Sequence, residues 1–185
     1  HRELHGIECF DRTSHRSTHQ TVSHTRTFAR DIYDYHDLSA RVAEYAASVA
    51  SHLRRYKRMA INIEVFITTN PYHEQQPQRT GTYTINLPEP TSDTMEIAKA
   101  AAKALEQVWK PGYGYKRAGV TATKTESSNC RQLSLFTDRE KEQKRNRLMN
   151  TLDRLQKSGI NIHLAATQRR PETKEQQQRT DTEWK

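Results

Sequence analysis

The chain has 185 residues, of which 33% are hydrophobic, which is enough for one packed domain with an extension but not for a second large core. Its 30 Lys and Arg residues against 22 Asp and Glu give a net charge of +8. That balance favours nucleic acid over an anionic membrane surface as a partner, although a merely soluble basic protein can share it. No run approaches the roughly 20 apolar residues of a membrane span, and no signal-peptide pattern opens the chain.

The two cysteines, Cys9 and Cys130, lie far apart and lack metal-type pairing, which fits a reducing cytoplasm. The first residue is His1. We therefore expect a fragment of a longer protein, in which residues 1–20 are an irregular connector.

The first structured segment begins with a β-rich stretch at 21–28, followed by a helix that Asp37 can cap. The stretch 59–69 alternates like a half-buried strand, and after a loop the stretch 82–87 alternates again. In the first of these strands one face is Ile61, Ile63, Val65 and Ile67, and the other, which we expect to face solvent, is Asn62, Glu64 and Thr68. Asp93 and Glu96 form a capping box for a second helix, and 115–125 returns as a strand. The first helix is expected to bury Leu38, Val42, Tyr45, Ala46, Val49 and Leu53.

This order predicts an α+β fold of the split β-α-β-β-α-β kind, with four antiparallel strands and both helices on one face. We expect the domain to span 21–124, a linker 125–138, and a C-terminal extension 139–185. The extension opens with a helix that carries Leu148, Leu152 and Leu155 as a narrow apolar stripe and ends at Gly159. The tail lacks core-forming residues, and we expect it to be disordered.

The sequence indicates no catalytic or metal site. The histidines near the N-terminus lie in a stretch with no helix to hold four ligands together. Acidic residues are scattered over predicted helices, and no Gly-rich phosphate loop is present. We therefore expect no catalytic residue, metal ligand or cofactor within this chain.

The open sheet face is the better candidate site, because hydroxyl and cationic groups on a sheet suit contacts with phosphates. Phe66 is the main candidate for a stacking aromatic residue. Arg26 is included, although the alternation that buries Phe28 points it inward. The candidate DNA-binding residues are Thr21, Ser23, Thr25, Arg26, Thr27, Arg117, Thr121, Thr123 and Lys124.

The linker contains an apolar cluster, "QLSLF", in a polar setting. Exposed clusters of this kind usually bind a partner. It resembles the pentapeptide with which bacterial DNA polymerases and repair proteins bind the sliding clamp. The resemblance assigns clamp binding to Gln132, Leu133, Ser134, Leu135 and Phe136.

Further stretches resemble the same family in its own order: "RELHG" at 2–6, "TRTFAR" at 25–30, "FITTNPY" at 66–72 and "WKPGYGYKRAGV" at 109–120. Together they resemble, over roughly 1–165, the C-terminal part of UmuC-type polymerases, which are Y-family translesion enzymes. The resemblance implies a little finger that lies along primer–template DNA, followed by a clamp peptide. It does not extend to the palm, fingers and thumb, so magnesium is implied only for a parent polymerase.

The implied function is to hold DNA and to tether an error-prone polymerase to the sliding clamp in the bacterial cytoplasm, during damage tolerance and SOS repair. One alternative is a free-standing nucleic-acid-binding module of the same fold. Another is a small ferredoxin-like enzyme such as an acyl phosphatase, which needs an anion-cradling loop with a catalytic Arg and Asn. The resemblance leaves open whether a UmuD-like protein binds.

Overall fold

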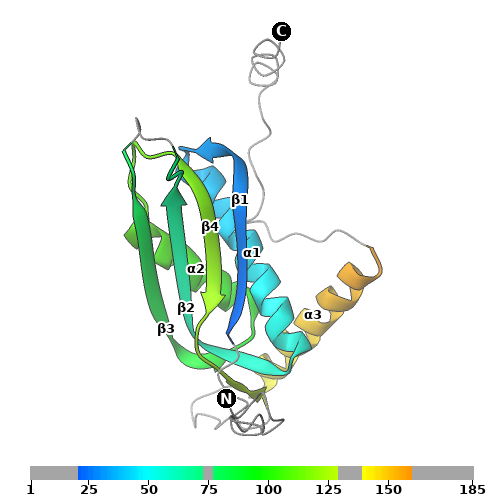
Figure 1. The fold of residues 1–185 in the computed structure, drawn as a ribbon. Coiled ribbons are helices and arrows are strands. Elements are labelled where there is room, and N and C mark those ends of the chain that lie inside the picture. Colours follow the sequence, from blue (N-terminus) through cyan, green and yellow to red (C-terminus); the bar gives the residue numbers. More distant parts are fainter. Residues whose placement is uncertain (1–20, 73–76, 129–138, 160–185) are drawn as a thin grey trace, which may run out of the picture.

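The computed structural model describes residues 21–72, 77–128 and 139–159. It contains one layer of strands covered by helices (Figure 1). Along the chain, the elements follow in the order β1, α1, β2, β3, α2, β4, β5 and α3. The expected β-α-β-β-α-β unit is confirmed and is followed by two additional elements. The strands are β1 (Val22–Ile32), β2 (Arg58–Thr69), β3 (Thr80–Thr91), β4 (Tyr115–Ala122) and β5 (Thr125–Ser127).

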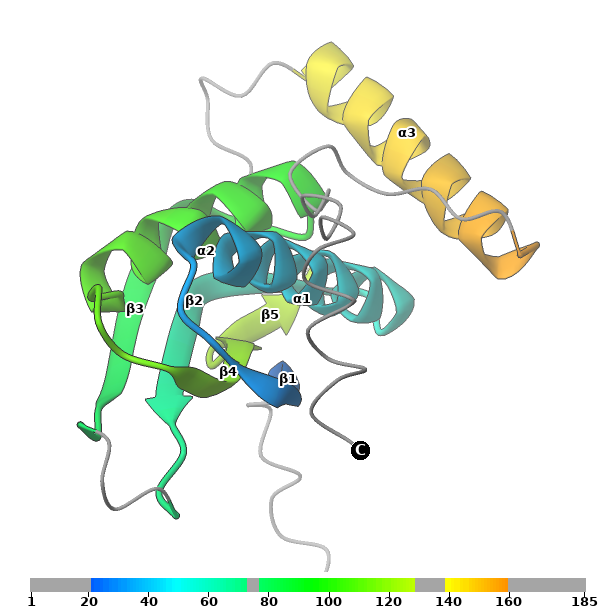
Figure 2. The same cartoon turned by 90° about the horizontal axis from the view of Figure 1, so that it is seen from above.

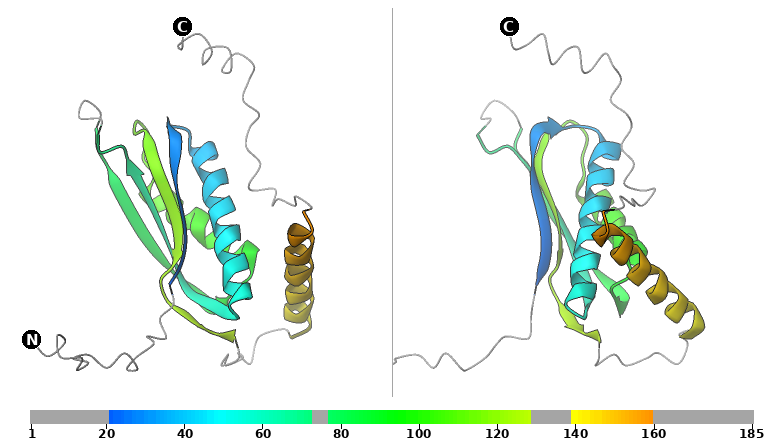
Figure 3. Two further views of the ribbon diagram at one scale, coloured as in Figure 1. Left: turned by 45° about the vertical axis from the view of Figure 1, so that its right-hand side comes forward. Right: turned by 90° about the vertical axis from the view of Figure 1, so that its right-hand side faces the viewer.

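The sheet is antiparallel throughout, with the spatial order β1-β4-β2-β3. Helices α1 (Tyr35–Arg55) and α2 (Thr94–Val108) both cover the same face, as expected (Figure 3). The short strand β5 pairs with the start of β2. Its residues, which we expected to open the linker, therefore extend the sheet.

The core lies between this face and the two helices. Ile63, Val65 and Ile67 of β2 are fully buried, as are Ala118 and Val120 of β4. The apolar stripe expected on the first helix is buried at every position. The inward-facing side chains of the strands, which alternate along the chain, thus pack against the helix side chains that recur every three or four residues.

Both main helices begin at an aspartate, but one of these caps differs from expectation. Asp34, not Asp37, caps α1, because its carboxylate accepts a hydrogen bond from the Asp37 amide at 3.1 Å. Asp93 caps α2 by accepting hydrogen bonds from the amides of Met95 and Glu96. The amide of Asp93 donates to the hydroxyl of Thr91.

The alternation of β2 is broken near its start. Its register with β3 shifts between Ala60 and Asn62, and Asn62 is buried although we expected it to face solvent. The Asn62 carboxamide oxygen accepts hydrogen bonds from the Thr123 hydroxyl at 2.7 Å and the Lys124 amide at 2.9 Å. These bonds hold the chain where it passes from β4 to β5, and they satisfy the buried amide.

Helix α3 (Arg139–Lys157) forms a third layer on the outer side of α1 and α2, away from the sheet (Figures 2 and 3). Its buried apolar side chain is Met149, whereas Leu148 is 52% exposed. Of the expected stripe, Leu152 and Leu155 are half-buried and Leu148 is exposed, so the contact centres on Met149, which the expected stripe did not include. No described helix is long and apolar enough to cross a membrane.

Candidate nucleic-acid interface

The sheet face opposite the helices is not covered by any other described element (Figure 3). In an antiparallel sheet, directly paired residues point to the same side. The strand pairing therefore aligns three rows of side chains across β1, β4, β2 and β3, which we call the open face. The rows are Thr27, Arg117, Thr68 and Thr80; Thr25, Gly119, Phe66 and Thr82; and Ser23, Thr121, Glu64 and Thr84.

Phe66 lies at the centre of the open face, directly beside Gly119. A Cβ atom at position 119 would come within 3.0 Å of the Phe66 ring and of the Thr25 methyl group. The glycine therefore provides the space in which the ring lies across β4. The guanidinium of Arg117 sits 5.5 Å from the centre of the same ring, within the range of a cation–π contact.

The surrounding positions are mostly threonine, and several are hydrogen-bonded to one another. The hydroxyls of Thr68 and Thr80 lie 2.8 Å apart, and the Thr84 hydroxyl donates to the Glu64 carboxylate at 3.2 Å. Hydroxyls on a flat sheet can donate to phosphate oxygens without reading base sequence. With one aromatic ring among them, this surface suits a sugar–phosphate backbone.

The open face carries little net charge. Arg117 is its cation and Glu64 is its anion among the described strand positions, so the face is rich in hydroxyls rather than strongly basic. The net charge of +8 is therefore distributed mainly over other parts of the chain. Lys124, which we expected on this face, is exposed just beyond the end of β4.

The structure brings five of the nine expected DNA-binding residues together in the rows of the open face, namely Ser23, Thr25, Thr27, Arg117 and Thr121, whereas Thr21, Arg26, Thr123 and Lys124 lie outside those rows. Thr21 precedes β1, and Arg26 pairs with the buried Ala118, so Arg26 points to the helix-bearing side and is exposed at the sheet edge. Thr123 is partly buried by its bond to Asn62. Thr80, Thr82 and Thr84 of β3 were not among the expected DNA-binding residues, although the alternation over 82–87 already placed Thr82 and Thr84 on the face away from Ile85.

The edge strand β1 also carries a histidine on the helix-bearing side. The His24 ring lies 5.1 Å from that of Tyr45 on α1. Burial lowers the pKa of His24 below the ordinary histidine value of 6.5, and the positive charge of Arg26 lowers the pKa further. The folded chain therefore disfavours the protonated ring.

This shift predicts that folding stability falls as the pH is lowered through about 6.5. Above that pH the ring is neutral in both states; below it the unfolded chain binds a proton that the folded chain resists. His24→Phe keeps a ring beside Tyr45 and removes the titration. Thermal melting between pH 7.5 and pH 5 should show a shallower loss for this variant than for wild type. Parallel curves would rule out His24 as the cause.

The clamp-motif residues Gln132, Leu133, Ser134, Leu135 and Phe136 lie outside the described residues. The described chain reaches Ser128, just beyond β5, and resumes at Arg139, where α3 begins. Within the described ranges, no group of His, Cys, Asp and Glu side chains could hold a metal ion.

The fold is an α+β module with a hydroxyl-rich antiparallel sheet and helices on one face. Residues 19–135 match the impB/mucB/samB family C-terminal domain. The chain is 32% identical to Protein ImpB of Salmonella typhimurium over 85% of its own length and 37% of that protein. It is 31% identical to Protein UmuC of Salmonella typhimurium strain LT2, over 83% of this chain and 36% of that protein.

The chain therefore belongs to the impB/mucB/samB family and corresponds to the C-terminal region of UmuC-like Y-family polymerases. It spans somewhat over a third of the length of these relatives. Among solved structures, it resembles the little finger domain of PolIV, solved in complex with the beta-clamp processivity factor. That match has a TM-score of 0.45 and 18% identity, and it covers 64% of this chain and all of the other.

Proposed function

We propose that this chain holds primer–template DNA through its open face and tethers an error-prone translesion polymerase to the sliding clamp. The family assignment supports the polymerase parent, and the position of "QLSLF" directly after the domain supports the clamp contact. Two weak contacts joined by a short segment raise the effective concentration of each partner for the other. The setting would be DNA damage tolerance and the SOS response in the bacterial cytoplasm, on the nucleoid.

The observation that carries the DNA-binding proposal is the three-row open face with Phe66 and Arg117 at its centre. Its hydroxyls and single ring fit a backbone whose sequence is not read. We assign no catalytic residue and no cofactor to this chain. Magnesium is implied only for the catalytic part of the parent polymerase, by the family to which the chain belongs.

We expect the chain to bind duplex DNA weakly, without sequence preference and with strong salt dependence. Phosphate neutralisation releases counterions, so affinity should fall steeply between about 50 and 200 mM salt. Arg117→Ala and Lys124→Ala should each weaken every duplex about equally and lower the salt slope by about 1. Glu64→Gln should strengthen binding, because it removes the carboxylate that repels phosphates. Fluorescence anisotropy at several salt concentrations measures all four proteins.

Lys103→Ala is the matched control, because Lys103 is exposed on α2, on the other side of the sheet. It should leave both affinity and slope close to those of wild type. A flat salt response would contradict the electrostatic account. Equal weakening by Lys103→Ala and Arg117→Ala would place the DNA elsewhere than on the open face.

A further inference from the structure

The contact between α3 and the rest of the domain depends on three side chains spaced four residues apart: Arg145, Met149 and Asp153. Residues at this spacing lie on one face of a helix. Met149 in the middle is 3% exposed, so α3 is seated on the domain at this point. The two flanking side chains make ion pairs with different helices.

At one end, Arg145 contacts the start of α2. Its guanidinium lies 2.9 Å from the Asp93 carboxylate and 2.9 Å from that of Glu96. Asp93 also caps α2 through its other carboxylate oxygen. Arg145 is about half exposed, with 47% of its side-chain surface accessible, so water and salt screen this pair.

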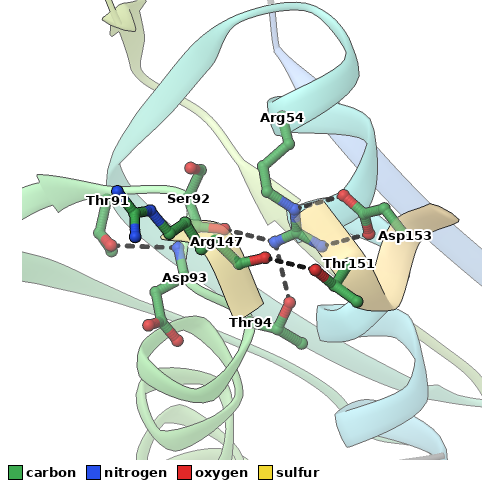
Figure 4. A network of polar contacts seen from close by, with 8 residues as sticks. All are labelled: Arg54, Thr91, Ser92, Asp93, Thr94, Arg147, Thr151 and Asp153. Carbon is green, nitrogen blue, oxygen red and sulfur yellow. Dashed lines mark hydrogen bonds and ion pairs between the residues drawn. The ribbon is translucent and has the colours of Figure 1, made fainter. Parts of the chain in front are cut away.

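On the other side of Met149, Asp153 makes a bidentate ion pair with Arg54 near the end of α1. Both guanidinium–carboxylate distances are 2.7 Å (Figure 4). The remaining Arg54 nitrogen donates to the Ser92 carbonyl at 2.6 Å and to the Thr94 hydroxyl at 2.9 Å. Arg54 is therefore held in place by the start of α2, and the two remaining nitrogens of its guanidinium point toward the Asp153 carboxylate.

The opposite signs of the two pairs fix the direction of α3. If the helix docked in reverse, Arg145 would approach Arg54 and Asp153 would approach Asp93 and Glu96. Such like-charge contacts disfavour the reversed arrangement. The contact is thus specific. Its buried apolar side chain among the described residues is Met149, and of its two ion pairs the exposed Arg145 pair weakens with salt, whereas the largely buried Arg54–Asp153 pair is screened much less.

We propose that α3 is an electrostatic latch that docks reversibly on α1 and α2. Docking fixes Ser128 and Arg139, the two ends of the segment 129–138. Release of α3 leaves that segment anchored only at Ser128. If, as under the proposed function, this segment binds the sliding clamp, release of α3 frees its C-terminal end while Ser128 still joins it to the domain, and part of the binding free energy is spent on release.

The test reverses the charge at both ends of α3 in the full chain, with Arg145→Glu and Asp153→Arg together. Hydrogen–deuterium exchange then reports on each element. Amides of α3 should exchange at least about tenfold faster than in wild type, because an undocked helix of this length is marginally stable. Amides of α1 and β2 should keep their protection. Raising the salt from about 0.1 M to about 1 M should produce a smaller change in wild type, because salt screens the exposed Arg145 pair more than the largely buried Arg54–Asp153 pair.

Arg147→Glu is the matched control. Arg147 lies on the same helix, is exposed, and undergoes the same change of charge as Arg145. It should leave exchange in α3 as in wild type. The latch is overturned if α3 keeps its protection in the double variant, or if Arg147→Glu removes protection equally.

Clamp binding separates this inference from the proposed function. At equal salt, the latch variant should bind the clamp about fivefold more tightly, because it no longer has to undock α3. Faster exchange in α3 with unchanged clamp affinity would overturn the coupling. If neither protein bound the clamp, the proposed function would fail, while the exchange data would still decide whether the latch exists.

Discussion

Leu135→Ala combined with Phe136→Ala should nearly abolish binding to the sliding clamp. Apolar anchors dominate interfaces of this kind, and truncating one often costs about 2 kcal/mol, or roughly thirtyfold in affinity. Two truncations together should exceed that factor, although the effects need not add. Gln132 is expected at the rim of the clamp pocket and Leu133 beside the anchors. Surface plasmon resonance with immobilised clamp measures the loss.

Ser134→Ala is the matched control, since we expect Ser134 to face solvent in the complex. Its clamp affinity should match that of wild type. The melting temperature should hardly change in the double variant, because a tether contributes little to the core. If the double variant instead lost several degrees of stability and kept its clamp affinity, the apolar cluster would serve packing rather than recognition.

Gly119→Ala should destabilise the domain by about 1–2 kcal/mol, which lowers the melting temperature by roughly 5–10 °C. The added methyl group would come within 3.0 Å of the Phe66 ring and the Thr25 methyl, so both must move. Displacing Phe66 also removes its contact with Arg117, and DNA affinity should fall with stability. Calorimetry and anisotropy on the same protein measure the two effects.

A second background tests this cause. In a chain carrying Phe66→Ala and Thr25→Ser, the atoms that obstruct a Cβ at position 119 are absent. There Gly119→Ala should cost little, and it should even stabilise slightly because alanine restricts the unfolded chain. An equal loss of stability in both backgrounds would show that the backbone at Gly119, and not its neighbours, requires glycine.

Local periodicity was sufficient for most of the fold. The spacing of Leu38, Val42 and Val49 predicted the buried face of α1, and the alternation of Ile63, Val65 and Ile67 predicted that of β2. These patterns hold because a side chain's direction follows from its own backbone geometry. The family resemblance in the sequence was confirmed by the match of residues 19–135 to the impB/mucB/samB family C-terminal domain.

The helix caps and the boundaries of the strands were less well determined by the sequence. Asp34 and Asp37 are both suitable caps by residue type, and the choice of Asp34 depends on where α1 begins to pack against the sheet. Asn62 was expected to face solvent because it alternates with Ile63. Its burial requires the turn from β4 into β5, which brings Thr123 to its carboxamide.

The chain order of the main helices and strands and the buried face of α1 were determined by the sequence itself, because each depends on residues within a few positions of one another. The tertiary structure alone decided which strands are neighbours, and hence that Phe66 lies against Gly119 and Arg117. It also decided that Arg54 meets Asp153, 99 residues further along the chain. Such contacts depend on how the chain closes on itself, and no local period of the sequence encodes the register or the partner.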